Sequence, residues 1–144
     1  MIQSKKNPRI PTKNHDGKQN GFLIPIINVN EGFPSPDAWP KQVYCTVAYP
    51  GQVKGPHLHK KRAGLFTCIK GNVKIVIRID GKYVEHFSGD DHEYATIQVP
   101  AGTPSALVNI GKEDAYILNM PSPAWSKDEP DDWDVSFEGY NFNA

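Results

Sequence analysis

The sequence has little cysteine, no net charge and no long hydrophobic run, and each absence excludes a class of protein. Its two cysteines, Cys45 and Cys68, lack CxxC spacing, so we expect two buried thiols rather than a disulfide framework or a zinc knuckle. Sixteen Lys and Arg residues balance sixteen Asp and Glu residues, which argues against a broad basic surface for nucleic acid. No apolar run approaches the roughly 20 residues that span a bilayer, and the N-terminus lacks the apolar core of a secretory signal. We therefore expect a cytoplasmic protein that binds neither nucleic acid nor membrane.

Thirteen prolines and twelve glycines interrupt the chain too often for long helices, which favours an all-β fold. A length of 144 residues suits one domain. We interpret the polar residues 1–20 as an N-terminal arm and residues 21–144 as a single domain. Turn sequences separate short apolar runs, as in a sandwich or jelly-roll barrel. The expected strands cover residues 21–29, 41–49, 64–71, 72–79, 82–87, 94–99, 105–110 and 115–120.

The run 72–79 alternates as a strand with one buried face should. Its inward positions are branched apolar residues, and its outward positions include two basic side chains. The inward set is Val73, Ile75, Ile77 and Ile79, and the outward set is Lys74, Val76 and Arg78.

The first chemical signal is the pair His57 and His59 in PGQVKGPHLHKKRAG. Two residues apart on a strand, both imidazoles project to the same face, which a barrel turns into a shared cavity. The pair alone is equally consistent with a ligand or catalytic site and with two surface histidines on an edge strand.

The surroundings of the histidines resemble the two motifs of the cupin superfamily. Five residues separate Gly51 from His57, and eleven separate His59 from Gly71, which is the spacing of the first motif. The second motif has its counterpart in VPAGTPSALVN, with its Pro-x-Gly centre at residues 100–102 and its terminal Asn at 109. This resemblance covers roughly residues 43–120 and implies the cupin double-stranded β-helix, a jelly-roll barrel.

The sequence departs from the cupin pattern at three positions. The Glu that helps bind metal in the family falls at Gly64, the second-motif His at Ser105 and the opening Gly at Tyr94. Two of the usual four metal ligands remain, whereas a catalytic metal normally has at least three protein ligands. We therefore expect no metal and no other cofactor.

Much of the chain resembles the metal-free cupins that modify nucleotide sugars. VYCTVAYPGQVKGPHLHKK is similar to dTDP-4-keto-6-deoxyglucose 3,4-ketoisomerases, and residues 94–139 look more like dTDP-4-dehydrorhamnose 3,5-epimerases. The resemblance implies an epimerase or isomerase acting on a nucleotide-linked 4-keto-6-deoxy sugar in polysaccharide or glycoside biosynthesis. It also implies a homodimer.

Both reactions remove a proton from a carbon beside a ketone, stabilise the enolate and return a proton. The resemblance assigns the base to His57, while His59 orients it, contacts the sugar or stabilises the oxyanion. The second proton carrier is Tyr44 or Tyr116, and we prefer Tyr44.

Binding a sugar diphosphate requires cations and polar contacts. The Lys that follows the His motif in the epimerases falls at Gly64, so the cluster 60–62 is a candidate replacement, with a solvated loop as the equal alternative. The epimerase carboxylate that pairs with the His lies in a C-terminal extension. Asp131, Asp132, Asp134 and Glu138 are candidate substitutes, although an acidic surface segment is the favoured interpretation. The candidate substrate contacts are Lys54, Lys60, Arg62, Lys74, Arg78, Ser105 and Asn109.

Two alternatives stay open. One is a metal-dependent cupin enzyme in which Gln98, Tyr or carboxylate side chains complete a site around His57 and His59. The other is a non-catalytic sugar-binding cupin, suggested by Gly64 and Ser105 in place of reactive side chains.

Overall fold

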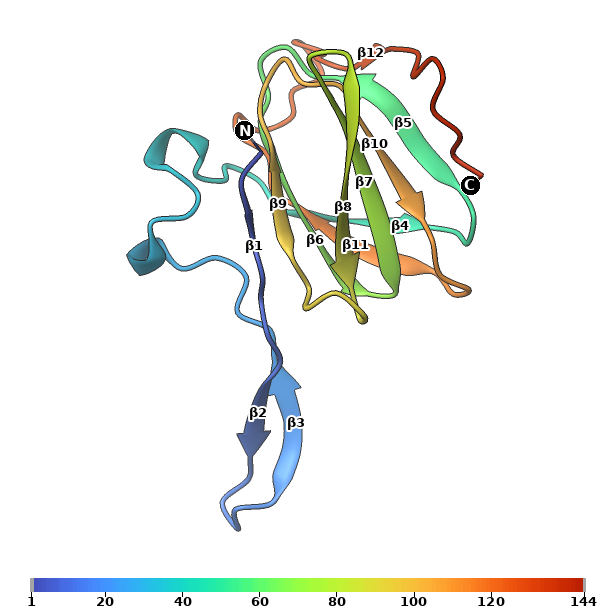
Figure 1. Ribbon diagram of the computed structural model, residues 1–144. Helices are drawn as coiled ribbons and strands as arrows, with labels where there is room; N and C mark the ends of the chain where they lie inside the picture. The colour runs from blue at the N-terminus through green and yellow to red at the C-terminus, as the bar shows by residue number, and fades with distance from the viewer. Residues whose placement is uncertain (1, 144) are drawn as a thin grey trace.

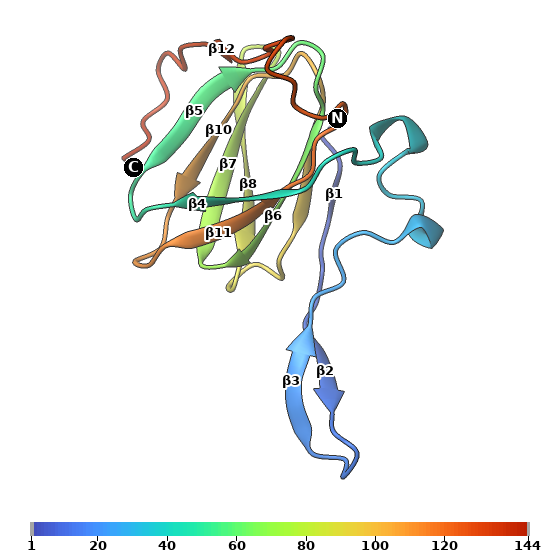
Figure 2. The same ribbon diagram turned by 180° about the vertical axis from the view of Figure 1, so that it is seen from behind.

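The computed structural model describes residues 2–143, and two five-stranded antiparallel sheets face each other in it as a cupin-like barrel (Figures 1 and 2). One sheet has the order β1-β9-β6-β11-β4, and the other has the order β12-β5-β10-β7-β8. The all-β cupin prediction is confirmed. The strands of the first sheet are β1 (Ser4–Lys5), β9 (Thr96–Val99), β6 (Gly64–Lys70), β11 (Ala115–Asn119) and β4 (Tyr44–Ala48). Those of the second are β12 (Trp133–Asp134), β5 (Val53–Leu58), β10 (Ser105–Asn109), β7 (Asn72–Ile79) and β8 (Lys82–Gly89).

The N-terminal part divides into a segment on the barrel and a segment that leaves it. β1 pairs with β9, and the buried Asn7 side chain donates to Thr96 Oγ1 and to the Tyr94 main-chain oxygen. β2 (Ile10–Lys13) and β3 (Gln19–Leu23) then form a hairpin that projects away from the barrel (Figure 1). The strand expected over 21–29 is wrong beyond Leu23, because the chain turns irregular before Pro25 and continues into the 3₁₀ turns η1 (Val29–Glu31) and η2 (Pro36–Ala38).

The hydrophobic core draws its residues from both sheets. Its residues include Cys68, Val73, Ile75, Ile77, Ile97, Leu107 and Ile117. Cys68 is buried, whereas Cys45 on the edge strand β4 is exposed, so the expectation of two buried thiols is wrong for Cys45. None of the helical turns within residues 2–143 is long and apolar enough to cross a membrane.

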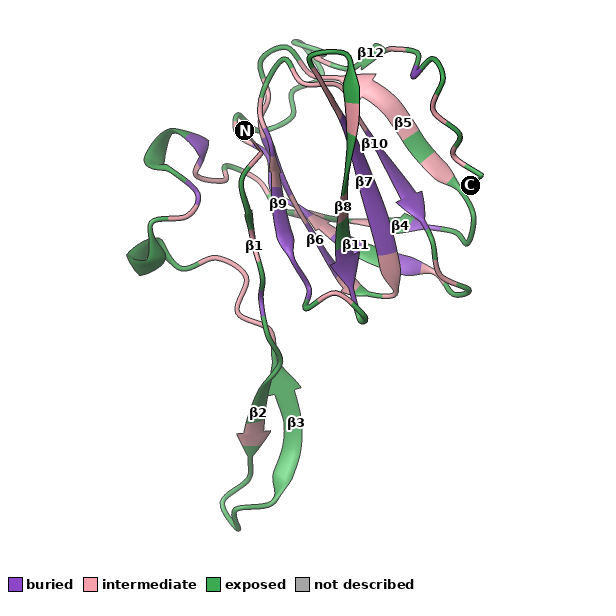
Figure 3. Ribbon diagram, viewed as in Figure 1, coloured by how far each residue is buried: buried purple, intermediate pink, exposed green. Residues whose placement is uncertain are grey.

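A second apolar cluster covers the outer face of the β5-β10-β7-β8 sheet. The C-terminal segment 135–142 folds back over that face, where Phe137 packs with Val76 and Ala106. Two of the three outward residues of β7, Lys74 and Val76, are therefore buried too, and most of the strand is purple in Figure 3. The prediction of a single buried face for β7 is wrong, because a segment 60 residues downstream covers the second one.

Candidate active site

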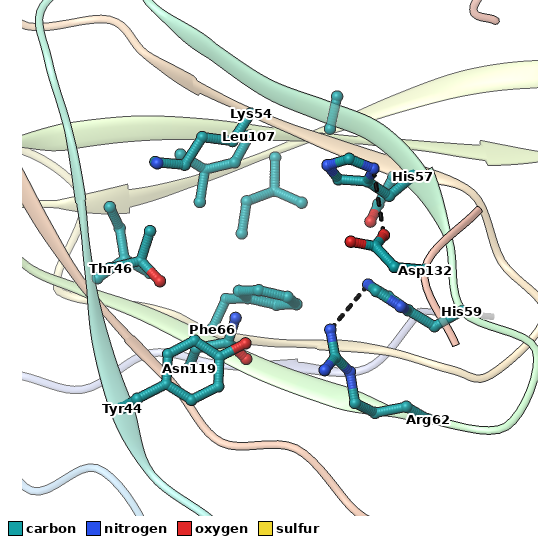
Figure 4. A pocket seen from close by; sticks show the side chains of 14 residues that line it. Tyr44, Thr46, Lys54, His57, His59, Arg62, Phe66, Leu107, Asn119 and Asp132 are labelled. Atoms are coloured by element: carbon teal, nitrogen blue, oxygen red, sulfur yellow. Dashed lines mark hydrogen bonds and ion pairs between the residues drawn. The ribbon is translucent and has the colours of Figure 1, made fainter. Parts of the chain in front are cut away.

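The barrel holds a pocket of about 310 Å³ whose walls come from both sheets (Figure 4). β5 and β10 form one wall, and β4, β6 and β11 form the other. The pocket is lined by Tyr44, Thr46, Lys54, His57, His59, Arg62, Phe66, Ile75, Ser105, Ala106, Leu107, Ile117, Asn119 and Asp132.

An irregularity in β5 turns both Lys54 and His57 toward the pocket. The register with β10 shifts here, because Ser105 is opposite His57 while Leu107 is opposite Lys54. Gly55 lies in the shifted stretch with a φ of +97°, and a Cβ there would meet the Ser105 main-chain oxygen at 3.0 Å. The residue must therefore be glycine for β5 to approach β10 this closely.

His57 lies against two carboxylates from the C-terminal segment. Its Nδ1 is 3.2 Å from Asp132 Oδ1 and 3.5 Å from Asp134 Oδ1. Among the described residues, neither carboxylate is aligned for a hydrogen bond to this nitrogen, so the contacts are close approaches of carboxylate oxygens to the ring. The other ring nitrogen points into the pocket (Figure 4). This arrangement favours a proton on Nδ1 and a free base at Nε2.

Asp131 attaches that C-terminal segment to the loop after β5. Its carboxylate accepts hydrogen bonds from the main-chain N–H groups of Lys60, Lys61 and Arg62, each at 2.9 Å. Partial burial opposes ionisation of Asp131, but these three N–H groups outweigh it and hold the pKa of the carboxyl below its usual range. The interpretation of an acidic surface segment is wrong for Asp131. Asp132 and Asp134 are exposed, as that interpretation expects, although both lie close to His57.

His59 and Arg62 form a fixed pair beside His57. His59 Nδ1 donates to the Asp131 main-chain oxygen at 2.6 Å, so its Nε2 must accept, and Arg62 Nη2 donates to it at 3.0 Å. Both nitrogens of His59 are thereby engaged. The remaining Arg62 N–H groups are the nearby donors that could meet a developing oxyanion.

The two candidate tyrosines lie on opposite faces of the β4–β11 sheet. Tyr44 lies on the pocket wall opposite His57 (Figure 4). Tyr116 lies on β11 between the inward positions Ala115 and Ile117, and its side chain is exposed on the outer face of the sheet. Only Tyr44 is placed to reach a ligand that touches His57.

Four of the candidate substrate contacts lie outside this pocket. Lys60 Nζ stacks over the Trp133 ring, and the buried Lys74 pairs with Glu85 at 3.1 Å on the outer face of β7. Arg78 donates to the Ser136 main-chain oxygen, again on the outer face. Asn109 is buried and donates to the main-chain oxygens of Ala48 and Glu113, which ties two turns together.

Sequence reasoning missed Thr46, Phe66 and Asn119 as pocket residues. Asn119 could have been found, because it shares the inward parity of β11 with Ile117. Phe66 also explains the departure at Gly64, since a Cβ on Gly64 would lie 2.9 Å from the Phe66 ring. The aromatic ring thus takes the space that a side chain at position 64 would need.

The geometry gives little support to a metal site. His57 and His59 have ring centroids 6.4 Å apart, and across residues 2–143 no group of three or more His, Cys, Asp or Glu side chains is arranged to hold a metal ion. Gln98, a ligand in the metal-dependent alternative, lies on β9 and is not part of the pocket lining.

A second hollow of about 240 Å³ adjoins the pocket and shares its rim. Tyr44, Arg62 and Asp132 line both spaces. The outer hollow adds Lys61 and the exposed ring of Trp125. Three carboxylates, of Glu129, Asp131 and Asp132, also line this hollow, so its charge is mixed beside an aromatic ring.

Comparison with known proteins shows that the chain is similar to proteins of polysaccharide and sugar biosynthesis. The family model of the polysaccharide biosynthesis C-terminal domain matches residues 37–133. The probable low-salt glycan biosynthesis epimerase Agl13 of Haloferax volcanii is 24% identical over 127 residues, which cover 83% of this chain and 80% of that protein.

Two solved structures share the fold. A dTDP sugar isomerase from Desulfovibrio desulfuricans superposes with a TM-score of 0.79 at 16% identity, covering 99% of this chain and 90% of that one. The sugar 3,4-ketoisomerase QdtA of Thermoanaerobacterium thermosaccharolyticum, solved with TDP, superposes with a TM-score of 0.68 at 20% identity, covering 91% and 85%.

Proposed function

The chain belongs to the polysaccharide biosynthesis C-terminal domain family, and from this premise we propose that it epimerises or isomerises a nucleotide-linked 4-keto-6-deoxy sugar. The observation that carries the proposal is the placement of His57. Its Nδ1 faces two carboxylates while its ring opens into a polar pocket inside the barrel.

Proton abstraction is the task of His57. Its Nε2 takes the proton from the carbon beside the ketone, and the imidazolium formed is stabilised by the Asp132 carboxylate. The electron pair of the broken C–H bond moves onto the ketone oxygen. Arg62, oriented by His59, and Lys54 are the cations that can stabilise this enolate oxygen.

Proton return decides the product. Tyr44 projects from the opposite sheet and can protonate the other face of the enolate, which inverts the carbon. Alternatively, the enolate oxygen is protonated to give an enediol. The hydroxyl on the carbon that lost its proton then gives up its own proton while the former ketone carbon is protonated, so that the carbonyl moves by one position. The same site supports both outcomes, in line with the epimerase and the ketoisomerase among the similar proteins.

The outer hollow suits the nucleoside half of such a substrate. The sugar would occupy the inner pocket, the diphosphate would lie near Arg62, and Trp125 offers a ring on which a base can stack.

A second copy of the chain is the partner we propose. The projecting β2–β3 hairpin exposes Ile10, Phe22 and Leu23, each by more than 40%. β4 is also an edge strand that bears the exposed Val47. Apolar side chains on a hairpin without an intramolecular partner favour exchange with a second chain. Sedimentation should give a dimer, and the variant Phe22→Ser with Leu23→Ser should give a monomer; a monomeric parent protein would refute this.

The substrate is tested by incubation of the protein in D2O with nucleotide-linked 4-keto-6-deoxy sugars, followed by NMR. Deuterium at one carbon beside the ketone indicates a ketoisomerase or monoepimerase, and deuterium at both C3 and C5 indicates a 3,5-epimerase. Binding of the sugars without any exchange would refute the enzymatic proposal and favour a sugar-binding cupin.

A further inference from the structure

The C-terminal residues that complete the site lie between the loop after β5 and the segment 135–142, which packs on the outer face of the sheet. β12, which contains Asp134, is two residues long and pairs only with β5, through Trp133 opposite Leu58 and Asp134 opposite His57. The side chain of Asp132 is 60% exposed and that of Asp134 is 98% exposed. Neither carboxylate is thus held in place by burial.

Asp131 attaches this segment to the barrel on the side of the histidines. Its two carboxylate oxygens accept three main-chain hydrogen bonds from the consecutive residues 60–62, which lie directly after the histidine strand. Hydrogen bonds to a charged acceptor are stronger than neutral ones, and three consecutive N–H groups form a concave anion site. The stacking of Lys60 over Trp133 supplements this attachment.

Asp131 is linked both to the His59–Arg62 pair and to the carboxylate beside His57. Its main-chain oxygen accepts from His59 Nδ1, and His59 in turn accepts from Arg62. Its neighbour Asp132 lies against His57 Nδ1. One residue therefore determines where the carboxylate meets the proposed base and how the proposed cation is oriented.

We propose that Asp131 is the positioning residue of this site, a latch that fixes the His57 carboxylates and the His59–Arg62 pair without touching the substrate. This inference rests on the proposed function for its effect on turnover. The attachment of the C-terminal segment by Asp131 can itself be tested without substrate.

The first test is hydrogen exchange of individual amides by NMR in the protein as it stands. In Asp131→Ala, the amides of residues 60–62 should exchange about 10- to 100-fold faster, because each loses a charged acceptor. Asp131→Asn keeps one acceptor oxygen and should give an intermediate rate. Asp128→Ala removes a charge from the same segment and should leave these amides unchanged. Unchanged exchange in Asp131→Ala would overturn the proposal.

The second readout separates positioning from general stability. Imidazole ¹⁵N shifts report which ring nitrogen carries the proton, and Asp131→Ala should remove the Nδ1–H preference of His57 and His59 while the amides of the barrel core keep their protection. A lower melting temperature with both tautomers intact would mean that Asp131 is merely structural and would overturn the proposal.

The third test compares kcat and KM among variants of Asp131, Asp132 and Asp134 in a double-mutant cycle. Asp131→Ala should lower kcat at least as much as Asp132→Asn, with KM changed less than about threefold. Asp131→Ala should lower kcat by a smaller factor in the Asp132→Asn, Asp134→Asn double variant than in the parent protein, because Asp131 acts partly through those two carboxylates. Fully multiplicative losses would overturn the proposal. If the parent protein shows no turnover, the proposed function fails, and amide exchange still decides the latch.

Discussion

Removing the charge of Asp132 should slow the reaction more than removing the charge of Asp134, although both carboxylates lie close to His57. Each substitution, Asp132→Asn and Asp134→Asn, keeps the size of the side chain and deletes the charge that stabilises the imidazolium in the transition state. The two distances differ little, at 3.2 and 3.5 Å. The exposures differ more, because 60% of the Asp132 side chain and 98% of the Asp134 side chain is open to solvent.

The magnitude follows from the screening of these charges. For two unit charges 3.2 Å apart, Coulomb's law gives about 1.3 kcal/mol in water and about 5 kcal/mol at an effective dielectric constant of 20. The exposure of Asp132 puts its contribution toward the lower value, at about 1–2 kcal/mol, which is about 5- to 30-fold in kcat/KM. Asp134 is a fully solvated surface charge, and its loss should cost at most about fivefold.

The assay is the initial rate of product formation by NMR, with thermal unfolding of each variant measured in parallel. Asp128→Asn carries the same change of charge in the same segment and serves as the control, with a rate within about twofold of the parent. A larger loss from Asp134→Asn than from Asp132→Asn would refute this reasoning. A parent-like rate for Asp132→Asn would do the same.

Three further changes test other parts of the account. Tyr44→Phe should lower the rate of product formation at least about 100-fold if Tyr44 carries the second proton. Tyr116→Phe changes a side chain on the outer face and should leave kcat unchanged in the same assay. Gly64→Ala should lower the free energy of unfolding by about 1 kcal/mol in urea titration, because its Cβ would press on the Phe66 ring; a second change, Phe66→Leu, should recover part of that loss, and independence of the two changes would contradict the explanation. The lowered pKa of Asp131 means that its contribution to stability is complete above the unfolded value near 3.8 and is lost as the pH falls through the lower folded value. The ¹³C carboxyl resonance of Asp131 should accordingly titrate below pH 3.8, and a midpoint above that value would contradict the hydrogen bonds to residues 60–62.

The sequence predicted the elements whose evidence is local. Alternation and turn residues located most of the barrel strands. The spacing of His57 and His59 placed both on the pocket, and the preference for Tyr44 over Tyr116 agrees with their positions on inner and outer faces. These inferences need only the period of a strand and the position of a motif.

The missed features depend on contacts between residues far apart in the chain. Asp131 lies about 70 positions from the N–H groups it binds, and nothing in its neighbourhood distinguishes it from a solvated acidic residue. Strand alternation placed Lys74 and Arg78 on the outward face of their strand but does not say what covers that face, where Glu85 and the Ser136 main-chain oxygen engage them.

The most direct test of the account is the rate at which deuterium from D2O enters the substrate beside its ketone, compared in the parent protein, His57→Ala and Tyr44→Phe. If His57 is the base, exchange should vanish in His57→Ala and persist in Tyr44→Phe, which retains proton abstraction but lacks the donor for the opposite face. Exchange at the parent rate in His57→Ala would contradict the central claim and assign proton abstraction to another group.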